Sequence, residues 1–406
     1  MLSEFEKQFE IIARGAVDIL PEEEFRQRLK KSINQNKPLR VKQGFDPTAP
    51  DIHLGHTVGI RKLKQFQELG HTIVLIIGDY TAMVGDPSGR SATRPRLSYD
   101  QIVANAETYQ QQFFKILDKN KTEIHYNGDW FKKMDFQEIM ELTAKFTVAR
   151  MLERDDFEKR FKSNVPISIH ELLYPLMQAY DSVAIKADVE IGATEQKFNL
   201  LTGREIQQDY GLEPQLVLTI PVLVGVDGHN RMSKSLGNYI GIDEASGDMF
   251  GKVMSIPDNL IYSYFELVTD VPTDKLKEIK EALRNDTVNP RDLKMELGET
   301  IVGMYHSRDE AIRARDEFIR MFRHKELPDE IPDFDCRSYG GKVWIIKLLT
   351  DSGMASSNGE ARRLIKGGGV SLDNEKISDE NLEIIIGDDM LLKVGKRRFL
   401  KLRCPS

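Results

Sequence analysis

Residues 39–78 read LRVKQGFDPTAPDIHLGHTVGIRKLKQFQELGHTIVLIIG and carry the strongest structural signal of the chain. Residues 39–45 alternate, which predicts an opening strand. After a polar turn with two prolines, apolar residues recur with helical spacing from about His53 until Gly70, which predicts a helix. Residues 72–78 form the continuous β-branched run of a parallel strand buried on both faces. This βαβ unit predicts an α/β fold with a Rossmann-like doubly wound parallel sheet that binds ligands at the carboxyl ends of its strands.

The periodicity of the remaining chain suggests four parts. Residues 99–160 are mostly helical and charged, residues 215–224 predict a second buried strand, and residues 242–325 are helical again. One helix start there is well marked by Asn289 as N-cap and Pro290 at the first helical position. We therefore expect a Rossmann-like domain over 1–240 with a helical insertion at about 99–160, an all-α domain over 241–325, an acidic proline-rich linker over 326–340 and a small α+β domain over 341–406.

The charge of the chain is unevenly distributed. Its 406 residues include 57 Lys and Arg against 64 Asp and Glu, a formal charge of −7. Residues 341–406 hold 12 Lys and Arg against 9 Asp and Glu, a charge of +3, which leaves −10 for residues 1–340. The net charge of the whole chain argues against a histone-like polycation, but it is compatible with a basic surface on the C-terminal part.

The cysteines and the hydropathy pattern indicate a compartment. Cys336 and Cys404 fit neither a disulfide framework nor a metal knuckle. The N-terminus lacks the pattern of a secretory or transit signal, and no window offers the ~18 consecutive apolar residues of a membrane span. We expect a cytoplasmic protein without membrane contact.

The start of the first predicted helix is a candidate phosphate site. Residues 47–56, PTAPDIHLGH, lie between strand and helix, where backbone N–H groups and the helix dipole attract an anion. His53 and His56 share one face and can donate hydrogen bonds to phosphate oxygens, while Gly55 has no side chain to block a base or ribose. The alternative is a capped helix with two polar surface histidines.

A second candidate phosphate site follows the predicted strand at 215–224. Residues 231–238, RMSKSLGN, place small residues around two cations, as in a loop that closes over a polyphosphate and stabilises charge on a leaving pyrophosphate. The alternative is an ordinary solvated basic loop.

A third set of residues predicts a polar pocket. Tyr174, Gln178 and Asp181 have helical spacing and lie on one face, where they offer a phenol, an amide and a carboxylate. The alternative is a polar helix face toward water, but the apolar residues between them favour a packed helix.

The C-terminal part carries a candidate RNA-binding surface. A predicted helix bears Arg362, Arg363 and Lys366, and a glycine turn, a strand and a hairpin follow it. Such a module presents a compact basic surface to an RNA backbone. The alternative is an αβ module with solvated charges.

The two phosphate motifs resemble the HIGH and KMSKS signatures of class I aminoacyl-tRNA synthetases. From about Gly44 to the C-terminus the chain is similar to the bacterial-type tyrosyl-tRNA synthetases, on the further motifs GFDPTA (44–49), GDPSG (85–89), Tyr174 with Gln178 and Asp181, and GATEQ (192–196). The C-terminal part resembles the RNA-binding fold of a ribosomal small-subunit protein.

That resemblance implies an ATP-dependent tyrosine–tRNA ligase. The enzyme would form tyrosyl-adenylate from L-tyrosine and ATP, with Mg²⁺ accompanying the ATP, and pass the tyrosine to the 3′ end of tRNA(Tyr). It would hold no structural metal and would work as a homodimer that uses the segment near 146–159. Rejection of phenylalanine by an unpaired buried carboxylate would make editing unnecessary.

The resemblance also implies a role for each site residue. The catalytic set is Thr48, His53, His56, Arg231 and Lys234. The ATP-binding set is Gly55, Glu195, Met232, Ser233, Lys234 and Ser235. The tyrosine-binding set is Asp86, Tyr174, Gln178, Asp181 and Gln196, and Lys42 is a further candidate for this set. The tRNA-binding set is Arg90, Arg94, Arg362, Arg363 and Lys366.

Four positions depart from the family pattern. Lys42 stands where many members have a tyrosine that touches the substrate hydroxyl, and it either pairs with Asp181 or turns away. Arg231 replaces the first lysine of KMSKS, Glu195 replaces an aspartate that binds the ATP ribose, and Ala193 replaces a glycine.

Other functions remain open from the sequence. A tryptophanyl-type synthetase shares the expected fold, but it leaves Asp181 and the C-terminal RNA module unexplained. A non-catalytic RNA-binding protein descended from a synthetase is disfavoured by the intact motifs. An HxGH nucleotidyltransferase of cofactor metabolism does not explain the RNA module.

Overall fold

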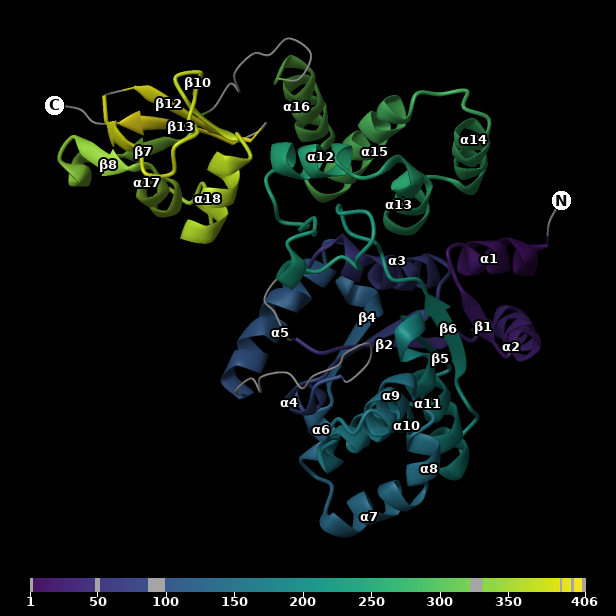
Figure 1. Cartoon of the computed structure of the whole chain (residues 1–406). Helices are drawn as coiled ribbons and strands as arrows, with labels where there is room; N and C mark the ends of the chain where they lie inside the picture. Colours follow the sequence, from purple (N-terminus) through teal and green to yellow (C-terminus); the bar gives the residue numbers. More distant parts are fainter. Residues whose placement is uncertain are drawn as a thin grey trace. The chain divides into compact units, whose positions relative to one another are not determined.

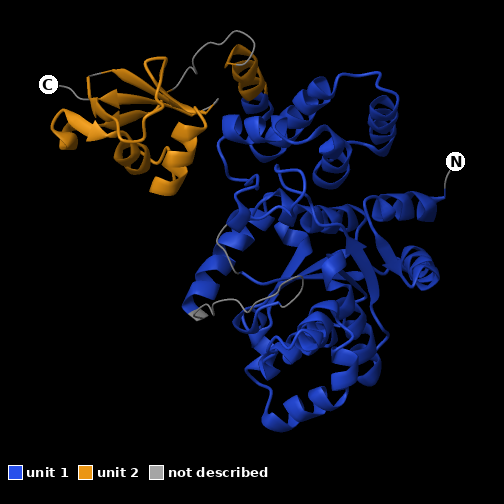
Figure 2. Ribbon diagram, viewed as in Figure 1, with its two compact units in different colours: residues 1–311 blue, residues 312–406 orange. Residues whose placement is uncertain are grey.

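The structure, a computed structural model, describes residues 3–47, 52–86, 99–321, 331–387, 389–395 and 398–403 (Figure 1). The chain divides into two compact units, residues 1–311 and residues 312–406 (Figure 2). Among the described residues, no helix is both long and apolar enough to cross a membrane.

Unit 1 is built on a six-stranded sheet with the order β1-β6-β5-β2-β3-β4. Its strands are β1 (Asp18–Leu20), β2 (Arg40–Phe45), β3 (Thr72–Ile77), β4 (Thr122–Tyr126), β5 (Val189–Ala193) and β6 (Leu216–Ile220). All pairs are parallel except β1 with β6. The chain runs from β2 to β3 on one side and later enters β5 on the other, so β2 and β5 flank the switch point of a doubly wound sheet. The predicted fold class is confirmed.

The predicted βαβ unit consists of β2, α3 (Leu54–Glu68) and β3. β3 is buried on both faces, as its β-branched sequence predicts, and residues 73–77 are each at most 1% exposed. α3 packs on β2, β3 and β5, while α11 (Lys197–Asp209) packs on β5 and β6. Figure 1 shows α3 on one side of the sheet and α10 (Tyr174–Ile185) with α11 on the other.

Residues 99–160 differ in part from the expected helical insertion. α5 (Tyr99–Phe113) leads into β4, which pairs with β3 at the edge of the sheet. Every residue of β4 is half-buried, and its charged and polar side chains hide the strand from a search for apolar runs. The helices that leave the sheet begin only after β4. They are α6 (Gly128–Phe131), α7 (Phe136–Ala144), α8 (Val148–Met151) and α9 (Asp155–Lys162), followed by the short turn η2 (Ile169–Leu173).

Most of the remaining helices of unit 1 lie at its two ends in sequence, whereas the short α4 (Thr81–Val84) follows β3. They are α1 (Glu4–Ala13), α2 (Glu22–Gln35), α4, α12 (Ser246–Met254), α13 (Ile261–Val268), α14 (Thr273–Arg284) and α15 (Pro290–Tyr305), with α16 (Arg308–Ile319) crossing into unit 2. α15 begins as predicted, because the Asn289 side chain accepts a hydrogen bond from Arg291 N at 3.0 Å. The segment that follows α13 is tied to α3 by the ion pair of Arg61 with Asp270.

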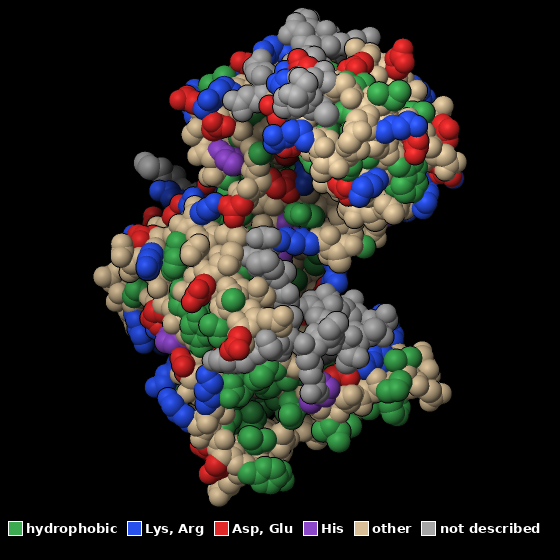
Figure 3. Space-filling model, turned by 90° about the vertical axis from the view of Figure 1, so that its left-hand side faces the viewer, with side chains coloured by type: hydrophobic (Ala, Val, Ile, Leu, Met, Phe, Trp, Pro, Cys, Tyr) green, Lys and Arg blue, Asp and Glu red, His purple; other side chains and the backbone are tan. Residues whose placement is uncertain are grey.

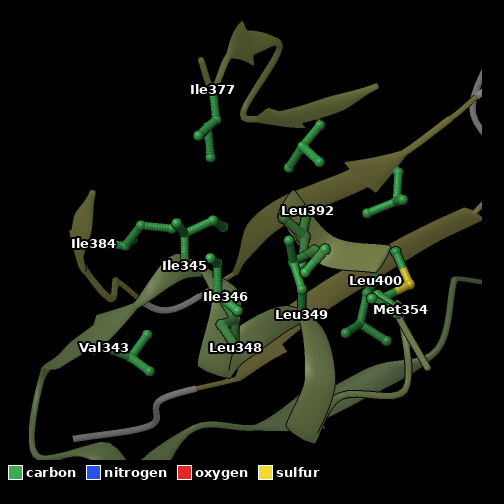
Figure 4. Packing of buried hydrophobic residues seen from close by; sticks show 14 of the residues in the cluster. Val343, Ile345, Ile346, Leu348, Leu349, Met354, Ile377, Ile384, Leu392 and Leu400 are labelled. Atoms are coloured by element: carbon green, nitrogen blue, oxygen red, sulfur yellow. The ribbon is translucent and has the colours of Figure 1, made fainter. Parts of the chain in front are cut away.

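Unit 2 contains a five-stranded sheet in the order β10-β9-β12-β13-β7 and a two-stranded sheet, β11-β8. Its elements are β7 (Asp333–Asp335), β8 (Lys342–Trp344), α17 (Ile345–Asp351), α18 (Asn358–Lys366), β9 (Val370–Leu372), β10 (Glu375–Lys376), β11 (Glu383–Ile385), β12 (Met390–Val394) and β13 (Arg398–Arg403). One apolar core, which includes Ile345, Leu349 and Leu392, joins these elements (Figure 4). Unit 2 therefore has a core of its own.

Candidate active site

A small pocket opens at the switch point of the sheet. It is lined from the carboxyl ends of β2, β3 and β5 and from α10, where doubly wound sheets bind their ligands. The lining residues are Gly44, Phe45, Asp46, Ile76, Gly78, Thr81, Tyr174, Gln178, Asp181, Ile191 and Gln196. Four residues of the predicted tyrosine-binding set, Tyr174, Gln178, Asp181 and Gln196, thus meet in one place.

Asp181 is the buried carboxyl of this pocket. It is 3% exposed and accepts hydrogen bonds from Trp130 Nε1 at 3.0 Å and Asn127 Nδ2 at 3.4 Å. Burial raises the pKa of Asp181 to about 7, although the charge of Lys42 and the two hydrogen bonds oppose the rise. Near neutral pH the group therefore exchanges a proton and can accept a hydrogen bond from a phenol.

Tyr174 is held by Asp46, a residue of the GFDPTA motif. The Tyr174 hydroxyl donates to Asp46 Oδ2 at 2.9 Å, and Thr81 Oγ1 donates to Asp46 Oδ1 at 2.7 Å. Burial, the largest cause, and the charge of Asp46 raise the pKa of Tyr174 well above its ordinary value. Gly78 makes this arrangement possible, because a Cβ there would lie 2.2 Å from both Asp46 Oδ1 and Thr81 Oγ1.

Asp86 lies beside the same pocket and is held from two sides. Gln196 Nε2 donates to Asp86 Oδ2 at 3.3 Å, and Arg154 Nη2 donates to Asp86 Oδ1 at 3.4 Å. Arg154 is 3% exposed and also donates to Asn199 Oδ1 at 3.1 Å. Asn199 in turn donates to Gln178 Oε1 at 2.9 Å. A continuous set of hydrogen bonds therefore connects Asp86 with Gln178.

Lys42 takes the second of the two orientations left open by the sequence and turns away from Asp181. Its ammonium is fully buried and lies 3.0 Å from Glu190 Oε1. It also donates to Gln178 O and to Ser182 Oγ, each at 2.8 Å. These three acceptors match the three N–H groups of a lysine ammonium.

The two imidazoles of the predicted phosphate site stack at the start of α3. Their ring centroids are 3.9 Å apart, and His53 caps the helix by accepting a hydrogen bond from Gly55 N at 3.1 Å. Burial lowers the pKa of His53 to about 3 and that of His56 to about 4, and the nearby Lys234 adds to both effects. Both rings are therefore neutral at pH 7, and each keeps one N–H donor for a phosphate oxygen.

The two phosphate motifs touch each other. Met232 is 5% exposed, and its sulfur lies 3.3 Å from Gly55 N. Arg231 Nη1 donates to Glu195 Oε2 at 3.1 Å, so two of the four positions that depart from the family pattern are paired with each other. Ser233 and Ser235 exchange a hydrogen bond of 2.9 Å through their hydroxyls. Lys234 begins the short turn η4 (Lys234–Leu236), and its Nζ lies 5.8 Å from the centroid of the Tyr239 ring.

Asn238, which is 3% exposed, holds the loop 231–238 in place through its side chain. Its side chain accepts from Ser233 N at 2.8 Å and donates to Arg231 O and to Asp227 Oδ2, each at 3.0 Å. One buried amide thereby ties the last residue of the motif to its first and third residues.

The other predicted site residues lie elsewhere or outside the described part of the chain. Thr48, Arg90 and Arg94 fall outside the described residues. Arg362, Arg363 and Lys366 share α18 of unit 2, and all three are exposed. Among the described residues, no group of three or more His, Cys, Asp or Glu side chains could hold a metal ion.

Several residues of the site had no assigned role in the sequence-based prediction. They are Asp46, Thr81, Asn127, Trp130, Arg154, Glu190 and Asn199. Asp46 carried a signal, since it stands inside a quoted motif. The others act through contacts between elements far apart in sequence, and their side chains have no spacing that marks a pocket.

Comparison with known proteins identifies relatives of both units. A family model described as "tRNA synthetases class I (W and Y)" matches residues 34–323, and an "S4 domain" model matches residues 343–389. Curated proteins named tyrosine–tRNA ligase match almost the whole chain. The protein of Carboxydothermus hydrogenoformans is 54% identical over 99% of this chain and 98% of its own length. That of Moorella thermoacetica is 51% identical over 98% and 96%, and that of Thermotoga maritima is 49% identical over 98% and 97%.

Solved structures share the fold. A tyrosyl-tRNA synthetase of Archaeoglobus fulgidus, complexed with L-tyrosine, has a TM-score of 0.62 at 22% identity and covers 77% of this chain and 100% of its own. A C-terminally truncated mitochondrial tyrosyl-tRNA synthetase of Aspergillus nidulans has a TM-score of 0.64 at 21% identity, with 79% and 95% covered.

Proposed function

Because this chain belongs to the class I tRNA synthetase family of the tryptophan and tyrosine enzymes and is a tyrosine–tRNA ligase, we propose that the switch-point pocket binds the amino acid. The observation that carries this proposal is a buried carboxyl, Asp181, on the same helix face as Tyr174 and Gln178. Asp181 accepts a hydrogen bond from the substrate phenol, and Tyr174, Gln178 and Asp86 hold the α-ammonium. Gln196 lines the pocket and orients Asp86.

We propose that the two phosphate motifs bind ATP together. ATP enters as its Mg²⁺ complex, with its phosphates over the start of α3 and its ribose near Glu195. Gly55, Met232, Ser233 and Ser235 shape the nucleotide site. The tyrosine carboxylate attacks the α-phosphorus, a P–O bond forms, and the bond to pyrophosphate breaks with its electron pair on the leaving group.

In this proposal the chain supplies position and charge. Neutral His53 and His56 donate N–H groups, and Lys234, Arg231 and Thr48 stabilise the charge that grows on the phosphates. No side chain acts as a covalent nucleophile. A ribose hydroxyl of the terminal adenosine of tRNA(Tyr) then attacks the tyrosyl carbonyl carbon, a tyrosyl ester forms, and the acyl–phosphate bond breaks with AMP as the leaving group.

We propose that unit 2 grips the tRNA through α18. Arg362, Arg363 and Lys366 expose three cations on one short helix, which suits a phosphate backbone. Arg90 and Arg94 are proposed contacts for the acceptor end. The proposed domain limits are 1–240, 241–325, 326–340 and 341–406, although β7, inside the proposed linker, pairs with β13 in the sheet of unit 2. The cysteine pattern supports a cytoplasmic location.

We propose that the enzyme is a homodimer joined through the segment near 146–159 and the neighbouring helices that follow β4. Large apolar side chains are exposed there, namely Phe136 (76%), Met140 (54%), Val148 (64%), Phe161 (63%) and Ile169 (81%). Hydrophobic side chains gather over the lower end of unit 1 in Figure 3, the end that contains α7 in Figure 1. An apolar surface of this kind is typical of a site covered by a second copy.

The decisive experiment is pyrophosphate exchange with tyrosine, tryptophan and phenylalanine side by side. The proposed pocket predicts exchange with tyrosine and rejection of phenylalanine by ~10⁴–10⁵, the range that the same class of enzyme illustrates for a site built around a substrate hydroxyl. Equal exchange with tryptophan would favour the tryptophanyl alternative, and absence of any exchange would favour a non-catalytic RNA-binding protein.

A further inference from the structure

A buried ion pair lies directly behind the amino-acid pocket. Lys42 and Glu190 are 0% exposed and their charged atoms are 3.0 Å apart. Neither residue lines the pocket. Replacing such a pair by apolar residues of similar volume is often neutral for stability or favourable. Stability alone therefore gives no reason for two charges at this position.

The pair instead contacts Gln178, which lines the pocket, and Ser182, one turn further along α10. Glu190 also accepts a hydrogen bond from Gln215 Nε2. Lys42 donates to Gln178 O and Ser182 Oγ, at 2.8 Å each, on the turn of α10 that also carries Asp181. Glu190 Oε1 accepts from the side-chain amide of Gln178 at 3.0 Å, and Glu190 Oε2 accepts from Ser182 Oγ at 3.3 Å. Both the backbone and the side chain of Gln178 are therefore fixed by one ion pair.

The pair also occupies a decisive position in the sheet. β2 and β5 are joined by only two register pairs, Val41 with Val189 and Lys42 with Glu190. Beyond these pairs Gly44 and Ile191 line the pocket. Lys42 and Glu190 thus lie at the last point where the two strands are paired before they part at the pocket.

We propose that Lys42 and Glu190 are positioning residues that set tyrosine affinity and the rejection of phenylalanine, an inference that rests on the proposed tyrosine site. The ion pair fixes the turn 178–182 of α10 against the point where β2 and β5 separate. The Gln178 amide then faces the ammonium position, and the Asp181 carboxyl faces the position of the hydroxyl. Two apolar side chains would fill the same volume but would leave this turn without the four hydrogen bonds that the ion pair makes with it.

The experiment compares the wild type with a Lys42→Met/Glu190→Met double variant. Melting temperature, KM and kcat for tyrosine, KM for ATP, and the ratio of kcat/KM for tyrosine over phenylalanine are measured by pyrophosphate exchange. We expect a folded double variant with a KM for tyrosine raised about tenfold, kcat changed less than about threefold, and a discrimination ratio lowered at least about tenfold. KM for ATP should stay within about twofold of the wild type.

Lys62→Met is the matched control. Lys62 is also a buried lysine and is 4% exposed. It lies on the second half of α3, away from the proposed phosphate site at the start of the helix, and it donates to Ile12 O at 2.8 Å. Its loss should lower stability and leave both KM for tyrosine and discrimination unchanged. This control separates the loss of a buried cation from the loss of the contacts to α10.

Glu190→Gln and Ser182→Ala keep the proposal testable if the double variant does not fold. Each removes part of the anchor with little change in volume, and each should raise KM for tyrosine at least about threefold with kcat nearly unchanged. If these variants fold but keep the wild-type KM for tyrosine and the wild-type discrimination against phenylalanine, the proposal is overturned. Failure of the wild type to exchange with tyrosine would instead overturn the proposed function.

Discussion

Replacing Asp181 by asparagine should change how the stability of unit 1 depends on pH. Burial raises the pKa of Asp181 from an ordinary 3.8 to about 7 in the folded chain. The unfolded chain therefore loses this proton above about pH 4, whereas the folded chain keeps it until about pH 7. The stability that the proton provides is complete below pH 4 and is lost as the pH rises through 7. The Asp181→Asn variant has no such proton to lose.

The size of the effect follows from the displacement of the pKa. One pH unit corresponds to about 1.4 kcal/mol, so the whole displacement corresponds to about 4 kcal/mol. About 1.5 kcal/mol of this contribution to the free energy of unfolding is already lost at pH 5. The free energy of unfolding of Asp181→Asn, relative to the wild type, should therefore rise by about 2–3 kcal/mol between pH 5 and pH 8. The carboxamide turns a donor toward Trp130 or Asn127, which subtracts about 1–3 kcal/mol at every pH and leaves this slope intact.

Urea unfolding followed by tryptophan fluorescence can measure this difference. The chain has two tryptophans, Trp130 in unit 1 and Trp344 in unit 2. Trp344→Phe in both proteins leaves Trp130, the hydrogen-bond donor to Asp181, as the reporter of unit 1. Measurements at pH 5, 6, 7 and 8 cancel all other titrations in the difference. A difference that stays constant within about 0.5 kcal/mol over this range would refute the reasoning, because Asp181 would then titrate alike in both states.

Three further predictions concern ATP and tRNA. Lys234→Ala should slow tyrosine-dependent pyrophosphate exchange by at least about 10²-fold while KM for tyrosine changes less than about threefold, and an unchanged exchange rate would exclude a catalytic role of the loop. Asn238→Ala removes three hydrogen bonds that fix this loop, so KM for ATP should rise about tenfold; an equal rise in KM for tyrosine would point to general unfolding. Combined Arg362→Ala, Arg363→Ala and Lys366→Ala should weaken tRNA binding and reduce its salt dependence, measured by filter binding, with exchange unchanged as the internal control.

The strongly periodic parts of the chain were predictable because their burial is uniform. β3 is covered on both faces and reads as an unbroken apolar run, and the start of α3 is marked by a residue that caps the helix, as the structure shows for His53. Tyr174, Gln178 and Asp181 were predicted together because helical spacing alone places them on one face.

The rest of the site depends on tertiary contacts that leave no local pattern. Trp130 reaches Asp181 from a short helix 51 positions away, and Glu190 reaches Lys42 across neighbouring strands. The sequence left the partner of Lys42 open, because a buried ammonium needs acceptors and spacing does not say which carboxylate supplies them.

The strand that the periodicity missed also affects how the protein behaves at high concentration. β4 is the last strand of its sheet, and an edge strand with free backbone groups can template aggregation. Glu123 on β4 binds Arg40 through two hydrogen bonds of 2.8 Å and lies 3.2 Å from His125. At the other edge β1 spans only three residues. The charged side chains that hid β4 from the search for apolar runs thus also make it a poor template for another chain. Both edge strands of the sheet therefore discourage the edge-to-edge growth of fibrils.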